Sequence, residues 1–572
     1  MKTGEDLRRS ITGIDHKSYG MYKNLAGSYQ FRNYILHFDH VQGDPFASPS
    51  RLRLELTAAD HGFPGEYRQS KHRKLALEDM VLRQFQKNLR SLDTGRMGSG
   101  KSGRISCCRT GQTIQERIAV LFQKDRLEIR FEMGLPARGR TILGREMTDL
   151  VFHLLPKLVT GTFVYGRWSE EAKKRLSDAI KLSDNQAFIR EELERRGLTA
   201  FVADGAILPR ESGISDRPMK EAIPFSSPED LRVEIFLPHG QPITGMGIPE
   251  GITVIAGGGY HGKSTLLKAL EQGVYNHIRG DGREYVLTRD YAFKIRAEDG
   301  RSVNHTDISL FINHLPNGQD TRDFTTENAS GSTSQAANLM EALETGSRLL
   351  LLDEDTSATN FMIRDKVMAK LVSDDKEPIC TLLRRIRTLW ERKGVSFILV
   401  VGSSGDYLSV ADLVLQLDHY HVKNVTAAAR EIIEKEGLSN QYPAGETEDL
   451  KKSRQLLPVR TGRMKCKASG TDSVIIDRDL IDVRYLEQLT EPEQTVGLTY
   501  LTAYVCSSQK EAEDFKALAD RIYQKIDRDG FMALIPRNYP AGQPALPRKE
   551  EMMACLNRYR ALKFNRNRQT GI

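Results

Sequence analysis

A glycine-rich segment near the middle of the chain has the residue types and spacing to hold phosphate groups. It consists of Gly257, Gly258, Gly259, Tyr260, His261, Gly262, Lys263, Ser264 and Thr265, and it fits the pattern G-x4-G-K-[ST]. Glycines let successive backbone N–H groups turn inward around phosphates. The lysine can reach the β- and γ-phosphates, and the Ser264 hydroxyl can bind Mg²⁺. The segment therefore predicts a site for ATP with Mg²⁺, in which Lys263 also takes part in catalysis.

The same pattern occurs a second time upstream, at residues 95–102, but in different surroundings. Residues 252–256 read as a buried strand and residues 265–275 as a helix, which is the context that a phosphate loop requires. Around the upstream copy, residues 88–94 do not read as a buried strand, and residues 103–108 alternate like a strand. We therefore expect a basic, flexible glycine loop there. Whether this loop contacts the phosphates of another ligand, such as nucleic acid, stays open.

Two adjacent carboxylates follow a run of four leucines, residues 349–352. Such a run predicts a buried strand, and Asp353 and Glu354 would stand at its end. Asp353 lies 90 residues beyond Lys263 and could hold Mg²⁺ directly or through water. Glu354 is placed to orient and activate the attacking water, so we expect it to be the principal catalytic residue.

Residues 353–360 resemble the Walker B motif and D-loop of the ABC ATPase superfamily, and residues 329–335 resemble its signature motif. The resemblance implies a head-to-tail homodimer with two ATP molecules between the subunits. Ser330 and Gly331 of one subunit would then contact the γ-phosphate held by the other, at a helix end with free N–H donors. Asp355 stands where the superfamily usually has proline.

Other positions depart from the superfamily pattern. Tyr260 replaces a usual glycine of the phosphate loop, and residues 402–404 read Gly-Ser-Ser where a switch histidine is expected. The sequence therefore leaves open whether hydrolysis is slow or whether another group contacts the γ-phosphate. The glutamine of the Q-loop has no clear counterpart, with Glu298 and Gln319 as candidates.

A closer resemblance is carried by residues 42–51, 201–210, 257–265 and 280–283. Together they are similar to the soluble proteins identified as predicted ATPases of the ABC class, from about residue 10 to the C-terminus. Tyr260 and His261 are features of that family in this light. Residues 208–210 and 217–218 could form a structural loop or could approach the nucleotide.

Length and composition suit a protein of several domains, because 572 residues exceed a single hydrophobic core. Short apolar strands that alternate with helices predict an α/β fold with an ABC-type P-loop ATPase core, a mainly parallel sheet and two flanking domains. We expect an N-terminal αβ domain at 1–160, the ATPase domain at 161–440 and a small C-terminal αβ domain at 456–572. In the last, we expect strands near 473–476 and 495–505 and helices at 510–526 and 549–563.

Localisation follows from what the sequence lacks. No run of about 20 apolar residues predicts a membrane span, and the first residues do not read as a secretory signal. The six cysteines form no CxxC pair, which indicates reduced thiols and no zinc or iron–sulfur site. We therefore expect a cytoplasmic protein without a membrane partner.

Basic residues are concentrated in two segments. Residues 68–109 hold eleven Lys/Arg and three acids, and residues 537–568 hold eight Lys/Arg and two acids, while the whole chain has a net charge of +7. This asymmetry is typical of proteins that bind polyanions, so RNA or DNA is the favoured partner. The two basic segments could instead be solvated faces without a bound polyanion. The protein would then be an ATP-driven protein-remodelling switch or a detached transporter ATPase subunit. No signature of sequence-specific RNA or DNA readout is present.

Overall fold

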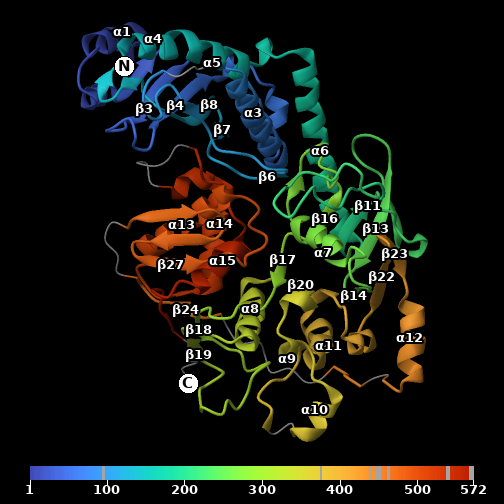
Figure 1. The fold of residues 1–572 in the computed structure, drawn as a ribbon. Coiled ribbons are helices and arrows are strands. Elements are labelled where there is room, and N and C mark those ends of the chain that lie inside the picture. Colours follow the sequence, from blue (N-terminus) through green and yellow to red (C-terminus); the bar gives the residue numbers. More distant parts are fainter. Residues whose placement is uncertain are drawn as a thin grey trace. The chain divides into compact units, whose positions relative to one another are not determined.

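A computed structural model describes residues 1–92, 97–373, 376–438, 441–444, 453–459, 464–535 and 542–565. The chain divides into two compact units: Met1–Asp184 with Phe531–Leu546, and Asn185–Gly530 with Pro547–Ile572. Figure 1 shows the elements of both units. The division into three domains near residues 160 and 456 stays a prediction.

The first unit is built on an antiparallel sheet with helices over its apolar face. Along β4, Leu52, Leu54 and Leu56 are buried, and the intervening side chains Arg53 and Glu55 are partly exposed, as the two-residue period of a half-covered strand requires. The strand order is β1-β2-β3-β4-β8-β5, with β7 beside β8 and only β1 and β2 parallel. The strands are β1 Lys2–Thr3, β2 Gly27–Gln30, β3 Ile35–His40, β4 Ser50–Thr57, β5 Ile105–Ser106, β7 Val120–Phe122 and β8 Arg126–Met133. The helices are α1 Gly4–Gly13, α2 Ala58–His61, α3 Lys71–Ser91, α4 Gly144–Asp149 and α5 Leu155–Phe163.

The second unit contains two larger sheets. Four antiparallel strands lie in the order β12-β13-β11-β16: Arg232–Ile235, Ile243–Pro249, Leu198–Ala203 and Val286–Thr288. Six further strands lie in the order β17-β20-β21-β14-β22-β23: Ala292–Ile295, Leu349–Asp353, Ser396–Val400, Ile252–Gly257, Leu413–Asp418 and His421–Asn424. The pairings described among β17, β20, β21, β14 and β22 are parallel, and β23 is antiparallel to β22. The predicted mainly parallel sheet of a P-loop core is thus confirmed.

Helices cover both faces of this parallel sheet, which explains why β20 is apolar on both sides. Leu349 and Leu351 share a core with Leu266, Leu267 and Leu270 of α7, Lys263–Gln272. The alternate leucines of β20 point to the opposite face, where α8 and α11 pack on the sheet. The helices after α7 are α8 Gly331–Thr345, α9 Thr359–Met362, α10 Lys366–Leu371, α11 Leu382–Lys393 and α12 Thr426–Lys435.

The C-terminal part is mixed α and β, as expected, but one element is of another type, and the helices expected at 510–526 and 549–563 span 515–529 and 549–557. Residues 495–505 belong to the helix α13, Pro492–Ser508, so the expected strand there is wrong. Proline sits in the first turn of α13, and Glu491 and Gln494 cap its start, while Thr, Leu and Val are buried on several sides of the helix. Burial of most of its β-branched residues gave this helix the composition of a strand. The other elements are β25 Cys466–Ser469, β26 Ser473–Ile476, β27 Asp479–Asp482, α14 Phe515–Asp529 and α15 Lys549–Asn557.

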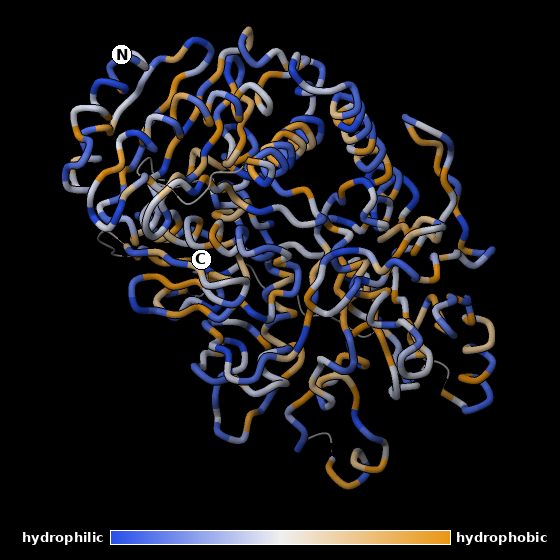
Figure 2. The backbone as a smooth tube through the Cα atoms, turned by 45° about the horizontal axis from the view of Figure 1, so that its top comes forward, coloured by the Kyte–Doolittle hydropathy of each residue, from blue (hydrophilic) through white to orange (hydrophobic). Residues whose placement is uncertain are grey.

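Hydrophobic and hydrophilic residues interleave along the chain (Figure 2). Among the helices that the structure describes, none is both long enough and apolar enough to cross a membrane.

Candidate nucleotide site

The phosphate loop joins β14 directly to α7, as its sequence predicts. Gly257 ends β14 with φ 139°, and a Cβ there would lie 2.4 Å from the carbonyl oxygen of Leu417, so only glycine fits. Gly262 caps α7 with φ 98°. Tyr260 has φ 63° and a side chain that is 99% exposed, so the loop holds a bulky residue in the left-handed region.

Lys263 closes the phosphate loop over its own backbone. Its ammonium donates to the carbonyl oxygens of Gly257 at 2.7 Å and of Gly258 at 2.8 Å. Ser264 is exposed and Thr265 half-buried in the first helical turn, where backbone N–H groups have no partner within the helix. A cation, a hydroxyl and unpaired N–H donors around a glycine loop fit the triphosphate of a nucleotide with Mg²⁺.

The order of the parallel strands brings the acidic pair to the same edge of the sheet as the phosphate loop. β21 lies between β20 and β14, and the three strands are parallel, so their carboxyl ends meet at one edge. The phosphate loop follows β14, Asp353 ends β20, and Glu354 comes next. Asp353 is buried and accepts the N–H of Asp355 at 3.1 Å. Within the described part of the chain, no hydrogen bond joins Asp353 to Ser264.

Glu354 is held by the segment that follows β21. Its Oε1 accepts from the hydroxyls of Ser403 and Ser404, both at 2.6 Å. Its Oε2 accepts from the N–H groups of Gly402 at 2.6 Å and Ser403 at 3.0 Å. Burial acts to raise the pKa of Glu354, but these hydrogen bonds outweigh it and lower the pKa to about 2. The carboxylate is therefore fully ionised at neutral pH.

Residues 402–404 are functional candidates that sequence reasoning missed. The sequence marked them only as the place where a histidine is lacking. The available signal was topological: residues after β21 must lie between those after β20 and those after β14 once the strand order is known. Two hydroxyls and two N–H groups at this place supply donors where an imidazole was expected.

Ser330 caps the start of α8, whose first residues belong to the signature-like motif. Its hydroxyl accepts the N–H of Thr333 at 3.5 Å, and Ser330 is exposed. One turn further, Gln335 holds the D-loop, because its amide group donates to Ser357 and accepts the N–H of Ala358 at 2.7 Å. Among the described residues no hydrogen bond or ion pair joins Ser330 or Gly331 to residues 257–265. The structure therefore does not bring these two parts of the predicted site together within one chain.

Three family models match successive parts of the chain. An ABC ATPase model described as the P-loop domain matches residues 172–454, and a model described as the N-terminal part of ATPases of the ABC class matches residues 4–166. A model described as the MRB1590 C-terminal domain matches residues 465–565. The chain belongs to the ATPases of the ABC class. Membership of this family implies use of a nucleotide and Mg²⁺.

The chain is also similar to individual proteins. An uncharacterised protein of Methanocaldococcus jannaschii, MJ1628, is 32% identical over 258 residues, which are 43% of this chain and 56% of the relative. The matched region therefore spans about half the length of that relative. Among solved structures, cbiO1 from Clostridium perfringens, described as part of the ABC transporter complex cbiONQ, is 13% identical with a TM-score of 0.26. That match covers 43% of this chain and 96% of cbiO1.

In this ABC-class ATPase, the two candidates for the Q-loop glutamine have other partners. Glu298 is buried and forms an ion pair with Arg558, and its carboxylate also accepts from Asn338 at 3.1 Å. Gln319 donates to the carbonyl of Thr325 at 2.6 Å. Neither side chain has a described contact with the phosphate loop.

Residues 208–210 and 280–283 form a network with the C-terminal end of α7. Arg283 is fully buried, donates to the carbonyl of Leu208 and reaches Gln272, the last residue of α7, at 3.0 Å. Arg210 forms an ion pair with Asp281 at 2.8 Å. These contacts favour the interpretation of residues 208–210 as a structural loop. A role near the nucleotide stays untested.

The upstream glycine loop uses its amides within the first unit. Residues 95 and 96 lie outside the described residues. From residue 97 onward, the N–H of Ser99 donates to Ala137, that of Lys101 to Pro45 and that of Gly103 to Gly134. The strand β5 follows rather than a helix. Amides that are bonded within the protein cannot cradle phosphates, which supports the expectation of a glycine loop without a nucleotide.

The two basic segments differ in how their charges are used. In the segment 537–568, whose residues 537–541 and 566–568 lie outside the described residues, Arg548 and Arg558 form ion pairs with Glu551 and Glu298, and Tyr559 is buried. These side chains are structural. In the segment 68–109, of which residues 93–96 are not described, several cations pair with acids. After the first turn of α3, the exposed cations among the described residues of this segment are Lys87, Arg90, Lys101, Arg104 and Arg109.

Proposed function

We propose that the protein binds ATP with Mg²⁺ at residues 257–265 and hydrolyses it. The observation that carries the proposal is the placement of Glu354 and the phosphate loop at the ends of strands separated only by β21, with Glu354 ionised and held by residues 402–404. A phosphate loop binds a nucleotide, and a positioned carboxylate beside it turns binding into hydrolysis.

Each residue then has a distinct task. Lys263 leaves its two loop carbonyls and pairs with the β- and γ-phosphates, while Ser264 and Asp353 hold the metal ion. Bound Mg²⁺ neutralises phosphate charge as a Lewis acid. Glu354 orients the attacking water and accepts its proton, for which the carboxylate must be ionised and at least partly released from its four donors.

The signature residues support a site completed by a second subunit. Ser330 and Gly331 begin a 15-residue helix at an exposed end, and such an end offers N–H donors to an anion. Without a described contact to the phosphate loop of their own chain, their expected partner is the γ-phosphate held by another copy in a head-to-tail homodimer. ATP would then favour closure, and hydrolysis would reopen the dimer.

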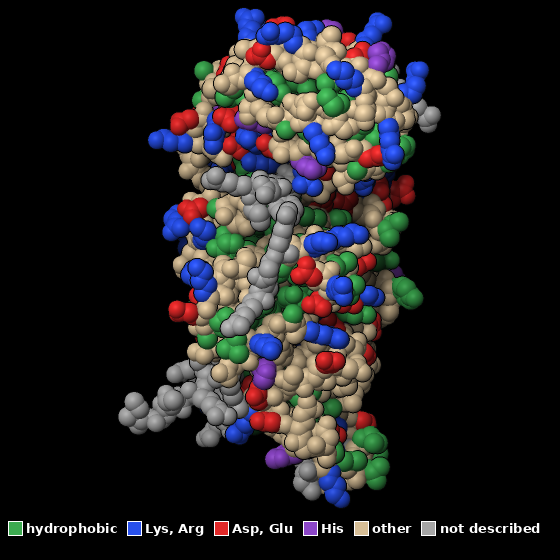
Figure 3. Space-filling model, turned by 90° about the vertical axis from the view of Figure 1, so that its left-hand side faces the viewer, with side chains coloured by type: hydrophobic (Ala, Val, Ile, Leu, Met, Phe, Trp, Pro, Cys, Tyr) green, Lys and Arg blue, Asp and Glu red, His purple; other side chains and the backbone are tan. Residues whose placement is uncertain are grey.

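Coupling to RNA or DNA is the second part of the proposal. Its support is the group of five exposed cations at and after the end of α3, since Lys and Arg that neutralise phosphates supply most non-specific affinity. On the face shown in Figure 3, Lys and Arg side chains stand among Asp and Glu. The proposed electrostatic attraction is assigned to this local group. An ATP-driven protein-remodelling switch is the alternative, because the structural arginines 548 and 558 reduce the free positive charge.

The test is ATP turnover by the full chain with single-stranded RNA, single-stranded DNA or duplex, measured across a salt series. Stimulation by one nucleic acid that weakens steeply with salt, and that is lost in the double variant Lys87→Glu/Arg90→Glu, is the expected result. ATP turnover that is unchanged by all three polymers would support the ATPase function and would indicate that the partner is a protein. Absence of turnover under every condition contradicts the hydrolytic function itself.

A further inference from the structure

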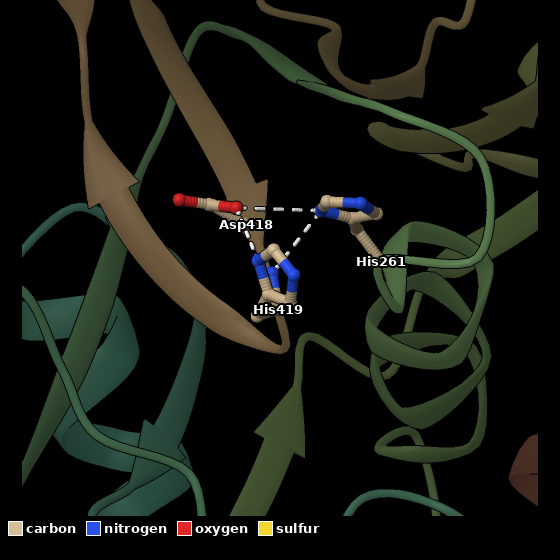
Figure 4. Close-up of side chains that lie close together, drawn as sticks. All are labelled: His261, Asp418 and His419. Atoms are coloured by element: carbon tan, nitrogen blue, oxygen red, sulfur yellow. Dashed lines mark hydrogen bonds and ion pairs between the residues drawn. The ribbon is translucent and has the colours of Figure 1, made fainter.

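A second cluster of metal-ligating side chains lies against the phosphate loop. It consists of His261 from the loop, Asp418 at the end of β22 and His419 directly after it, and the ligand atoms of all three lie within 4.8 Å of one another. The Oδ1 atom of Asp418 is 2.7 Å from Nδ1 of His419 and 3.6 Å from Nδ1 of His261. Figure 4 shows both rings and the carboxylate converging on one point between the loop and the hairpin.

We propose that His261, Asp418 and His419 form a site for one divalent cation of the Zn²⁺ type, which ties the phosphate loop to the β22–β23 hairpin. Two imidazoles and one carboxylate suit Zn²⁺ and its neighbours among the transition metals, and three protein ligands leave a position for water. This ion is distinct from the Mg²⁺ expected at Ser264 and Asp353, because Mg²⁺ prefers oxygen ligands alone.

The surroundings of Asp418 orient it for this task. Its second oxygen, Oδ2, pairs with Lys423 at 3.2 Å, which leaves Oδ1 facing both histidines. A partner that fixes a ligating carboxylate is the usual support of a metal site.

The rings are accessible and can adjust. The side chain of His419 is 84% exposed and that of Asp418 is 44% exposed, so a hydrated cation can enter. The backbone N–H of His419 donates to Nδ1 of His261 at 3.1 Å. A cation bound at that nitrogen replaces this one hydrogen bond, and a rotated His261 ring would present Nε2 instead.

The turn that carries His419 has an unusual backbone. Asp418 pairs with His421, so the hairpin loop has two residues, His419 and Tyr420, with φ values of 46° and 69°. Loops with two positive φ values favour Asn-Gly, and bulky residues there are strained unless their surroundings hold them. The Tyr420 ring lies 3.1 Å from where a Cβ of Gly262 would be. The turn is therefore pressed against the start of α7, and a bound cation would compensate part of its strain.

A cation at this place would restrain the phosphate loop. His261 lies between the glycines and Lys263, so fixing its ring to the hairpin limits how the loop can open. Binding of the cation and binding of a nucleotide are then coupled, and the coupling is reciprocal. The cation site itself does not depend on the proposed ATPase function.

The experiment is a titration of the full chain with Zn²⁺ and with Co²⁺ in the absence of nucleotide, because nucleotides chelate both ions. We expect wild type to bind one equivalent that His419→Ala and Asp418→Asn bind at least tenfold more weakly. Co²⁺ should give visible absorption bands of a low-coordinate site with nitrogen ligands, and a large excess of Mg²⁺ should not displace it. His305→Ala, which removes a histidine paired with Asp323 at 2.8 Å, is the matched control and should bind like wild type.

A thermal readout keeps the test independent of spectroscopy. Zn²⁺ should raise the unfolding midpoint of wild type and of His305→Ala but not of His419→Ala, because a ligand that binds only the folded state stabilises it. His419 is exposed in a turn, so its replacement should leave the apo midpoint close to that of wild type. Equal binding by wild type, His419→Ala and Asp418→Asn, or no binding by wild type, overturns the proposal. Loss of ATP hydrolysis with the cation site intact contradicts only the proposed function.

Discussion

The hydroxyl of Ser403 lies 2.6 Å from Oε1 of Glu354 and donates a hydrogen bond to it. Ser404 donates to the same oxygen, and two N–H groups occupy the other, so each carboxylate oxygen has two donors. In the superfamily that this chain resembles, a histidine is expected after this strand. Here two serines hold the carboxylate, and we infer that they set both its charge and its position.

Removing both serine hydroxyls should therefore move the pH dependence of ATP hydrolysis. The hydrogen bonds lower the pKa of Glu354 from 4.5 to about 2 although burial opposes them. In Ser403→Ala/Ser404→Ala only the two backbone N–H groups still oppose the effect of burial, so the pKa rises and the inactive protonated carboxyl forms at higher pH. We expect the rate of the double variant to fall toward pH 4 while that of wild type stays level, measured as turnover from pH 4 to 8.

The matched control for this variant is Ser409→Ala. The Ser409 hydroxyl donates to the carbonyl of Asp406 in the same loop and does not contact Glu354. Its rate profile should coincide with that of wild type. A rate of the double variant that stays level toward pH 4 would show that the serines do not control the charge of Glu354.

Lys263 and Lys101 occupy the same position of the same sequence pattern, but their replacement should affect ATP binding differently. Lys263→Ala removes a cation from the phosphate loop and should weaken ATP binding roughly tenfold to a hundredfold, since hydrogen bonds between charged groups contribute about 1.5–3 kcal/mol. Lys101→Ala should leave binding unchanged, because the amides around it are bonded to Pro45 and Gly134. Equilibrium binding of a fluorescent ATP analogue measures both. A large loss in Lys101→Ala would reveal a second nucleotide site.

Much of the core of the ATPase site could be predicted from sequence because its motifs are contiguous. The glycine loop between a strand and a helix, and four leucines before Asp353, are local patterns with a direct physical reading. Residues 402–404 could not be assigned in this way, because their contact with Glu354 depends on the strand order across the sheet. Pairing between distant segments leaves no local pattern.

Local sequence patterns also failed to predict which side chains are buried. The basic segment 537–568 was interpreted as a surface for nucleic acid, yet Arg558 and Tyr559 within it are buried, and Arg558 neutralises Glu298. The helix α13 was mistaken for a strand around residue 500, because a buried helix is rich in the same β-branched residues. The charge and composition of a segment do not show whether its side chains contact other residues inside the protein or a ligand outside it.

A buried acid in the first unit predicts a stability change with pH. Glu78 lies in α3 and accepts the N–H of Phe122 at 2.8 Å, and burial raises its pKa from 4.5 to about 8. The folded protein therefore keeps a proton that the unfolded chain releases, so the free energy of unfolding falls as pH rises from 4.5 to 8. The fall approaches about 1.4 kcal/mol for each pH unit as an upper bound.

Glu78→Gln removes this proton and keeps an oxygen for the N–H of Phe122. We expect the variant to be more stable than wild type at pH 8 to 9 and similar to it at pH 5, with thermal unfolding of both proteins as the measurement. The exposed acid Glu66, replaced as Glu66→Gln, serves as a surface control. An equal difference between variant and wild type at both pH values would mean that Glu78 is ionised throughout.

The composite dimer gives the most decisive prediction. Glu354→Gln removes the proton acceptor and should lower ATP turnover on the order of 10²- to 10⁴-fold, the usual contribution of a general base, while ATP binding persists. An ATP-bound state that cannot proceed should accumulate as a dimer, because Ser330 and Gly331 of each chain would contact the γ-phosphate of the other. Light scattering after gel filtration, with and without ATP and Mg²⁺, measures the mass.

Two further variants decide whether the dimer depends on the proposed contacts. Adding Lys263→Ala to Glu354→Gln weakens nucleotide binding and should return the protein to its mass without ATP at ATP concentrations that just saturate Glu354→Gln. Adding Ser330→Glu instead leaves the phosphate loop intact but places a negative charge at the start of α8, opposite the phosphate of the partner subunit. This variant should bind ATP and fail to dimerise. A dimer that survives Ser330→Glu would mean that the two copies associate through another surface and that each ATP site is complete within one chain.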